Sequence, residues 1–252
     1  MTVRNPDREA IRHGKITEEP IRPSRGLPTW GIKLGMAITG LIFGAFVLFH
    51  MVGNLKIYLP DYDDGTAQID VYGQFLREFG YPLLPHGSFL WMFRIVLLAC
   101  LLFHVYGAFA LHGRSSRFRG KFKRTNLMGG VNSFATRTML ITGIILLAFV
   151  IFHILDLTMG VAPAAPEEFV HGNIKDNMIA TFSRWPVTIW YIIAMVALFF
   201  HLCHGIWLAV SDLGVTGRRT RAVMVAIAYI VPAIVVLGNI VMPLTIALGW
   251  IS

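Results

Sequence analysis

The most informative feature of this 252-residue chain is its shortage of charge. Only 14% of the residues are charged and 55% are hydrophobic, whereas a soluble domain would carry nearer a quarter charged residues. Cysteine is almost absent as well. Cys100 and Cys203 both lie in apolar runs, and their spacing suits neither a disulfide nor a metal site. The composition therefore argues against a soluble domain and against a disulfide-rich fold.

The first residues also lack the pattern of a secretory leader. Residues 1–29 are polar and contain prolines, with no apolar core and no cleavage site, so we expect no removable signal peptide. The first apolar run must then direct membrane insertion itself. We predict a cytoplasmic N-terminal segment over residues 1–29.

Hydrophobic residues are gathered into five runs, each long enough to cross a membrane. About 20 helical residues span the ~30 Å of hydrocarbon at ~1.5 Å per residue. The predicted fold class is an all-α membrane protein with five transmembrane helices in one bundle over residues 30–252. We find no internal repeat, although four runs share a histidine with a small residue soon after. The predicted spans are 30–59, 89–111, 137–159, 187–210 and 223–250.

The distribution of lysine and arginine predicts the topology. Residues 1–33 and 112–137 each hold seven basic residues, and 211–222 hold three. Residues 60–88 hold one against five acids, and 160–186 hold two against three. Basic loops stay cytoplasmic, so we predict a multi-pass protein of the cell inner (plasma) membrane with its N-terminus inside and its C-terminus outside. The basic second loop is expected to contact lipid or a cytoplasmic partner, and not nucleic acid.

The first outer loop is expected to contain a short interfacial helix. Val71, Phe75 and Phe79 recur at helical spacing. Tyr81-Pro82 and Leu84-Pro85 should break the chain before the second span.

One histidine lies well inside each of the first four spans: His50, His104, His153 and His201. An ionisable side chain inside hydrocarbon is costly and marks a functional site by default. With the predicted topology, the first and third histidines lie nearer the outer face, and the second and fourth nearer the inner face. Two bis-histidine haems stacked across the membrane would need this arrangement. They would be non-covalent, because no C-x-x-C-H motif is present.

A lone membrane histidine is more often a hydrogen-bond donor or a proton carrier than a haem ligand, but four histidines matched in depth favour haem. A macrocycle also needs room, and residues three or four positions from a ligand share its helix face. Gly53, Gly107 and Gly205 occupy such positions, and we expect them to leave space for the ring. Gly40 and Gly44 should allow a helix or a ring edge to approach the first span closely.

Other polar residues inside the spans are weaker candidates. His204 follows the fourth-span histidine by one turn and stays open as an alternative ligand. Arg94 lies near the outer end of the second span and is expected to bind a haem propionate or Asp156. His112 ends the second span at the depth of propionates or a quinone headgroup, and a structural role at the interface is equally open.

The motifs around the four histidines resemble those of a known family. That family is the single-chain, five-helix dihaem cytochrome b subunit of succinate dehydrogenases and fumarate reductases. The resemblance assigns the fourth ligand to His201. It implies that His50 and His153 hold an outer haem b, and that His104 and His201 hold an inner one. The motifs are HMVGNL at 50–55, FHVYGA at 103–108, FHILD at 152–156 and FHLCHGIW at 200–207.

The resemblance also implies a function. The chain would anchor a flavoprotein subunit and an iron–sulfur subunit on the cytoplasmic face of respiratory complex II, within an oligomeric complex. It would pass electrons between the iron–sulfur subunit and a membrane quinone, typically menaquinone, as part of the tricarboxylic acid cycle. No catalytic residue for succinate is expected on this chain.

Two alternatives stay open. A cytochrome b subunit of a nitrate reductase or hydrogenase would also bind two haems, but such subunits draw several ligands from one helix. A proton-coupled transporter would explain intramembrane polar residues, but it would usually show inverted repeats and broken helices. No spacing rule selects the quinone site. Candidates are Trp30, Lys33, His112, Ser133, Arg137 and Asp212 near the inner haem, and Tyr81, His86, Trp91, Arg94 and Asp156 near the outer one.

Overall fold

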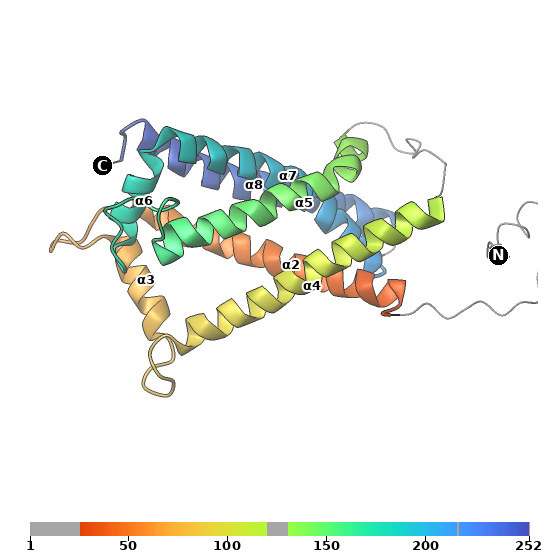
Figure 1. Cartoon of the computed structure of the whole chain (residues 1–252), viewed down its shortest axis with the longest axis horizontal. Helices are drawn as coiled ribbons and strands as arrows, with labels where there is room; N and C mark the ends of the chain where they lie inside the picture. The colour runs from red at the N-terminus through yellow and green to blue at the C-terminus, as the bar shows by residue number, and fades with distance from the viewer. Residues whose placement is uncertain (1–25, 120–130, 216, 252) are drawn as a thin grey trace, which may run out of the picture.

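A computed structural model shows long helices packed side by side, with two short helices at one end (Figure 1). The structure describes residues 26–119, 131–215 and 217–251, so nearly all of the predicted N-terminal segment lies outside it. The long helices are α2 (Thr29–Asn54), α4 (Ser88–Arg119), α5 (Val131–His153), α7 (Trp185–Asp212) and α8 (Arg218–Ala247). The short ones are α3 (Gln68–Glu78) and α6 (Ile174–Phe182). A 3₁₀ turn, η1 (Leu55–Tyr58), extends α2, and a π-helical segment, η2 (Ile154–Met159), extends α5.

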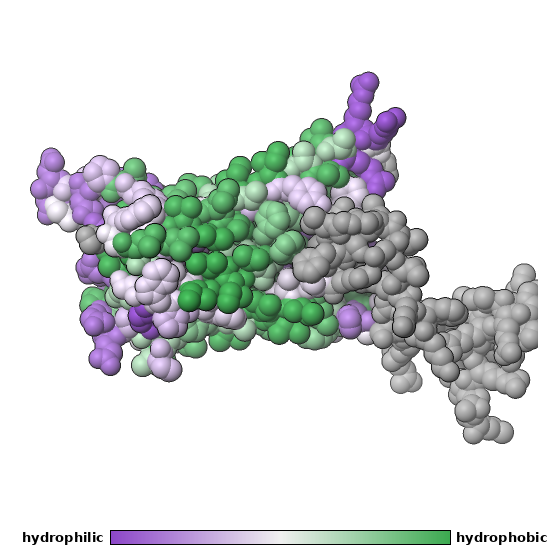
Figure 2. All heavy atoms as spheres, turned by 90° about the horizontal axis from the view of Figure 1, so that it is seen from above, coloured by the Kyte–Doolittle hydropathy of each residue, from purple (hydrophilic) through white to green (hydrophobic). Residues whose placement is uncertain are grey.

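Each of the five long helices is apolar enough to cross a membrane. Figure 2 shows the matching surface, a hydrophobic band between two hydrophilic ends. The predicted five-helix membrane fold is confirmed, and the spans agree with prediction to within a few residues at most ends. The main difference is α4, which continues past the predicted end at Leu111 as far as Arg119. No proline interrupts residues 112–119, so the helix can continue there. Most of these residues are polar, and we expect this part of α4 to extend beyond the hydrocarbon layer.

The two short helices gather at one end of the bundle, which we call the α3–α6 end (Figure 1). Helix α3 confirms that a short helix lies between the first two spans, whereas α6 was not foreseen. Asp70 of α3 joins the two, because its Oδ1 accepts hydrogen bonds from the first-turn amides of Ile174 and Lys175, the second at 3.1 Å. Such amides have no partner within their own helix, so one carboxylate both caps α6 and fixes it to α3.

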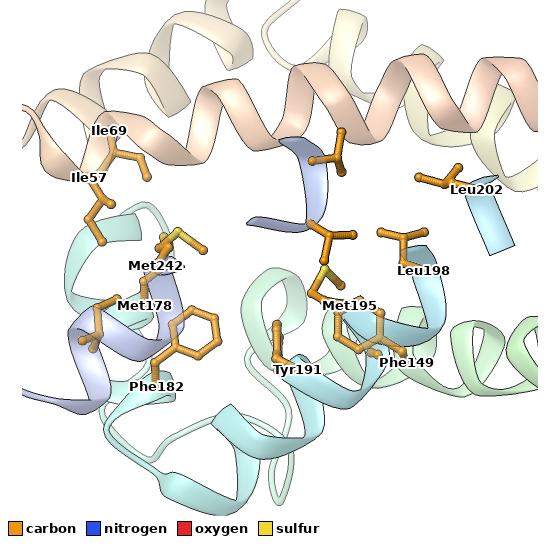
Figure 3. Close-up of a cluster of buried hydrophobic side chains, with 14 of the residues drawn as sticks. Ile57, Ile69, Phe149, Met178, Phe182, Tyr191, Met195, Leu198, Leu202 and Met242 are labelled. Atoms are coloured by element: carbon orange, nitrogen blue, oxygen red, sulfur yellow. The ribbon is translucent and has the colours of Figure 1, made fainter. Parts of the chain in front are cut away.

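Helix α7 is the centre of the bundle, since α2, α5 and α8 all pack on it, whereas α4 packs mainly on α2. Its buried side chains, among them Tyr191, Met195 and Leu198, form one apolar core with Phe149 of α5 and Phe182 of α6 (Figure 3). Tyr191 meets both phenylalanines edge-on with ring centroids 4.9 Å apart. This aromatic group anchors the α3–α6 end of the core.

Gly53 and Gly107 were expected to leave room for a macrocycle. This expectation is wrong, because both glycines allow side chains of neighbouring helices to pack closely instead. A Cβ at Gly107 would lie 2.7 Å from Met36 Cγ of α2, and one at Gly53 would lie 2.7 Å from Tyr72 Cε1 of α3. Small residues at such crossings let helix backbones approach closely. Gly205 fits its expectation, because a Cβ there would meet no atom within 4 Å.

The chain contains an internal repeat, contrary to the expectation from its sequence. Residues 38–50 read ITGLIFGAFVLFH and residues 141–153 read ITGIILLAFVIFH, with nine of thirteen positions identical. These segments belong to α2 and α5, and each is followed by a short helix and a second long helix with its own histidine. The order long, short, long therefore occurs twice, as α2–α3–α4 and α5–α6–α7. Most residues of the motif are apolar residues that are common in any membrane helix, so the repeat is hard to distinguish from ordinary apolar sequence.

We predict that Gly107→Leu weakens the α2–α4 contact, because the new side chain must displace Met36. Overpacking of this kind costs about 1–3 kcal/mol, measurable as a lower free energy of unfolding in detergent. Gly113→Leu on the same helix is the matched control. A Cβ there meets nothing within 4 Å, so the change should stay within about 0.5 kcal/mol. Equal destabilisation by both variants would contradict this packing.

Candidate functional site

The four intramembrane histidines form two facing pairs. The rings of His50 and His153 have centroids 5.8 Å apart and planes at 82°, and those of His104 and His201 have centroids 6.3 Å apart and planes at 55°. Each pair joins equivalent positions of the repeat, α2 with α5 and α4 with α7. The sequence predicted these same pairs from depth alone.

The spacing within each pair suits one metal ion between two imidazoles. A histidine nitrogen binds a transition metal at about 2 Å, and the ring centre lies roughly 1 Å behind that nitrogen. Two rings on opposite sides of one ion therefore have centroids about 6 Å apart. Direct hydrogen bonding between the two rings would bring them closer. The pairs thus have the separation of axial ligands to a haem iron.

The pair on the side where α2 begins is held by two threonines of the repeat. His104 Nδ1 lies 3.1 Å from Thr39 Oγ1, and His201 Nδ1 lies 3.2 Å from Thr142 Oγ1. Next to each threonine is a glycine whose Cβ would touch the imidazole, at 3.4 Å for Gly40 and 3.5 Å for Gly143. Gly40 therefore admits a ring edge, as its sequence position indicated.

Each threonine hydroxyl also has a backbone acceptor within its own helix, which favours one tautomer of both histidines. Thr39 donates to the carbonyl oxygen of Gly35 at 2.8 Å, and Thr142 donates to that of Thr138 at 3.0 Å. Each Oγ1 is then left to accept a hydrogen bond from the imidazole Nδ1–H. The lone pair consequently stands on Nε2, the nitrogen available for a metal.

The pair at the α3–α6 end is built differently. His153 Nδ1 lies 3.2 Å from the hydroxyl of Tyr191, which donates to Asp156 Oδ2 at 2.9 Å. Asp156 Oδ1 accepts from Thr181 Oγ1 and from an Arg184 guanidinium nitrogen, both at 3.0 Å. The carboxylate is fully buried and lies in the π-helical segment η2, whose wider turn is typical of functional sites. A charged group buried in this way needs such partners.

His50 has the fewest partners of the four. Its ring stacks on Phe46 at 5.3 Å, as that of His153 stacks on the equivalent Phe149 at 5.7 Å. Neither of its ring nitrogens has a hydrogen-bond partner among the described residues. The side chain is exposed at the bundle surface. An imidazole without a partner at this depth in hydrocarbon is expensive, which argues for a bound group that satisfies it.

The remaining candidates are spread over the molecule. Arg94 is exposed and lies over the Trp91 ring at 5.1 Å. The expected alternative of an Arg94–Asp156 pair is wrong, because Arg184 and two hydroxyls occupy the Asp156 oxygens. His112 is exposed near the end of α4. His204 is buried on α7, and the ring that lies opposite His104 at 6.3 Å is that of His201.

Several quinone candidates pair with one another. Lys33 and Asp212 form an ion pair at 3.2 Å, and Tyr81 stacks on His86 at 4.4 Å. The first pair lies at the end where α2 begins and the second near the α3–α6 end. The side chains of Ser133 and Arg137 lie outside the described part of the structure.

Sequence reasoning missed the groups that orient the histidines, namely Thr39, Thr142, Tyr191 and Arg184. The repeated ITG motif would have identified the two threonines, because each stands eleven residues before a paired histidine in the same repeat. Tyr191 and Arg184 carry no such signal. Tyr191 lies in α7 and Arg184 immediately precedes that helix. Only the packing of α5 against α7 brings them to Asp156.

The fold defines the class of protein, a multi-pass all-α membrane protein with paired histidines within its membrane spans. Residues 119–237 match the family model of the succinate dehydrogenase/fumarate reductase transmembrane subunit. The matched range includes α5, α6, α7 and most of α8, and with them His153 and His201. Over this range, somewhat less than half of its length, the chain is similar to that transmembrane subunit. No curated protein sequence and no solved structure matches the chain.

We predict that Asp156→Ala destabilises the fold by about 3 kcal/mol, because it leaves Arg184 and two hydroxyls without their acceptor. This is the low end of the range for a broken buried pair, since the Arg184 side chain is 30% exposed. Asp212→Ala is the control, and breaking its exposed pair with Lys33 should cost less than about 1 kcal/mol. Chemical unfolding in detergent measures both, and equal effects would contradict the role assigned to Asp156.

Proposed function

We propose that this chain is the membrane-anchor subunit of a succinate dehydrogenase or fumarate reductase, and that it carries electrons through two bis-histidine b haems, between an iron–sulfur subunit and a membrane quinone. The proposal is carried by the two facing pairs of histidines, His50 with His153 and His104 with His201. In three of these four histidines, Nδ1 lies next to a hydroxyl oxygen. A haem between each pair would supply an iron that exchanges one electron at a time.

The residues present fit such groups. His50 with His153 would hold one haem, and His104 with His201 the other. The histidines whose Nδ1 lies next to a hydroxyl oxygen, His104, His153 and His201, would bind through Nε2. The open space beside Gly205 would admit part of a macrocycle. The buried Arg184 Nε has no partner among the described residues, and it offers a donor for a haem carboxylate at the α3–α6 end. Arg94 and His112 stay proposed contacts of propionates or of the quinone.

The two sites are close enough to form one path. Thr39, at the level of His104, precedes His50 by eleven residues on α2, a rise of about 16 Å along a helix. With the N-terminus inside, the His104–His201 site lies nearer the cytoplasm and the His50–His153 site nearer the outer face. Electrons would then cross most of the membrane within this one chain.

The partners follow from charge and orientation. The end where α2 begins carries the basic loops, and positive loops are cytoplasmic. A flavoprotein subunit and an iron–sulfur subunit would dock there, and succinate chemistry would take place on them. Menaquinone is the proposed quinone. Two features disfavour the rivals. The paired histidines come one from each helix, which argues against the nitrate reductase or hydrogenase type. The halves of the repeat run in the same direction, which differs from the inverted repeats typical of transporters.

We predict that each histidine variant removes one specific haem. His50→Ala and His153→Ala should lose the same haem, while His104→Ala and His201→Ala should lose the other, because each variant removes one of the two histidines that would hold that haem. Reduced-minus-oxidised spectra of the purified complex, with haem counted per chain, measure this loss. His204→Ala is the matched control and should keep both haems.

A different pattern would contradict the proposal in a definite way. Retention of two haems in His201→Ala with loss in His204→Ala would move the fourth ligand by one turn. Retention of both haems in all four variants would exclude the pairs as ligands. Co-purification of a flavoprotein and an iron–sulfur protein with the tagged chain tests the docking, and purification of the chain alone under mild detergent would count against it.

A further inference from the structure

Within the described part of the chain, one of the four paired histidines, His153, is connected through hydrogen bonds to an ionised group. His153 Nδ1, the Tyr191 hydroxyl and Asp156 Oδ2 form a chain with links of 3.2 Å and 2.9 Å. Because Asp156 also accepts from Arg184, it acts as a carboxylate, which can only accept. The Tyr191 proton therefore points to Asp156, and the Tyr191 oxygen accepts from the His153 Nδ1–H.

This chain of hydrogen bonds is absent from the other half of the repeat. Alignment of α2 with α5 places Gly53 at the position of Asp156, and alignment of α4 with α7 on their histidines places Arg94 at the position of Tyr191. Glycine has no side-chain acceptor, and arginine has donors only. His50, the partner of His153, correspondingly has no recorded hydrogen bond. The repeat is symmetric at the threonine-held pair and asymmetric at the α3–α6 end.

We propose that Tyr191 and Asp156 are positioning residues for His153, which hold its Nδ1–H tautomer and make its Nε2 a stronger donor to a bound iron. The inference rests on the proposed haem between His50 and His153. A carboxylate behind a metal-bound histidine, here relayed by a phenol, raises the basicity of the ligand. A stronger donor stabilises ferric over ferrous iron, so the network lowers the midpoint potential of this haem relative to the same site without it.

The effect passes through the hydrogen bonds more than through the electric field of the carboxylate. Arg184 lies 3.0 Å from Asp156 Oδ1, and the two opposite charges largely cancel at the distance of the imidazole. Asp156 is 0% exposed and Tyr191 is 5% exposed, so water does not compete for the links. Hydrogen bonds in such a dry setting are stronger than in water.

Tyr191→Phe tests the inference, because it removes one oxygen and keeps the ring that packs on Phe149 and Phe182. Redox titration of the whole complex, followed by haem absorbance and by electron paramagnetic resonance of the ferric haems, is the measurement. We expect the midpoint potential of the His50–His153 haem to rise and its ferric g-values to shift, with the other haem unchanged. Tyr58→Phe is the matched control. Its hydroxyl bonds to Thr245 at 2.9 Å and not to a histidine, so neither haem should respond.

Asp156→Asn is the second variant, which serves where Tyr191→Phe loses the haem. It should raise the same potential further, because Arg184 then loses its counter-charge. Removing an outer-shell partner of a metal ligand typically weakens metal binding about 10–100-fold, so partial loss of this haem is also expected. That loss supports the inference only if the potential of the haem that remains is raised. Unchanged potentials in both variants, with two haems present, overturn the inference and leave the proposed function standing. A wild-type complex without haem overturns both.

Discussion

The structure depends on one constraint, which is that an imidazole inside hydrocarbon must have both ring nitrogens satisfied. Three of the four paired histidines use a hydroxyl oxygen for Nδ1. The rings of each pair lie 5.8 Å and 6.3 Å apart between centroids, a spacing too wide for a direct hydrogen bond and suited to one metal ion. The helices are arranged to make this possible, with glycines where imidazoles approach and phenylalanines stacked on the histidines of α2 and α5.

The internal repeat explains why the ligands come in pairs. A unit of long, short and long helix contributes one histidine from each long helix, and two such units placed side by side bring equivalent histidines together. Thr39 and Thr142 do the same task in both halves. At the α3–α6 end the halves have diverged, since Asp156 and Tyr191 face His153 while Gly53 and Arg94 stand at the equivalent positions. A symmetric scaffold thus holds two unequal sites.

Much of this could be predicted from the sequence, for physical reasons. Hydrophobic length predicts five spans, and the depth of each histidine predicts the pairs, because both follow from helix rise and membrane thickness. Helix rotation does not follow from sequence in the same way. Gly53 and Gly107 therefore looked like space for a ring, although they face Tyr72 and Met36. The partner of Asp156 was missed for the same reason, since Arg184 stands 28 residues away on a helix start that only packing brings near.

The central claim is that each histidine pair holds one haem b. The most direct measurement is a pyridine haemochrome assay on the purified complex, with haem counted per copy of this chain. Two b haems per chain is the result expected from the two pairs. A chain that is purified folded, with its partner subunits and without haem, would contradict the account, and the four histidines would then form a path for protons or ions.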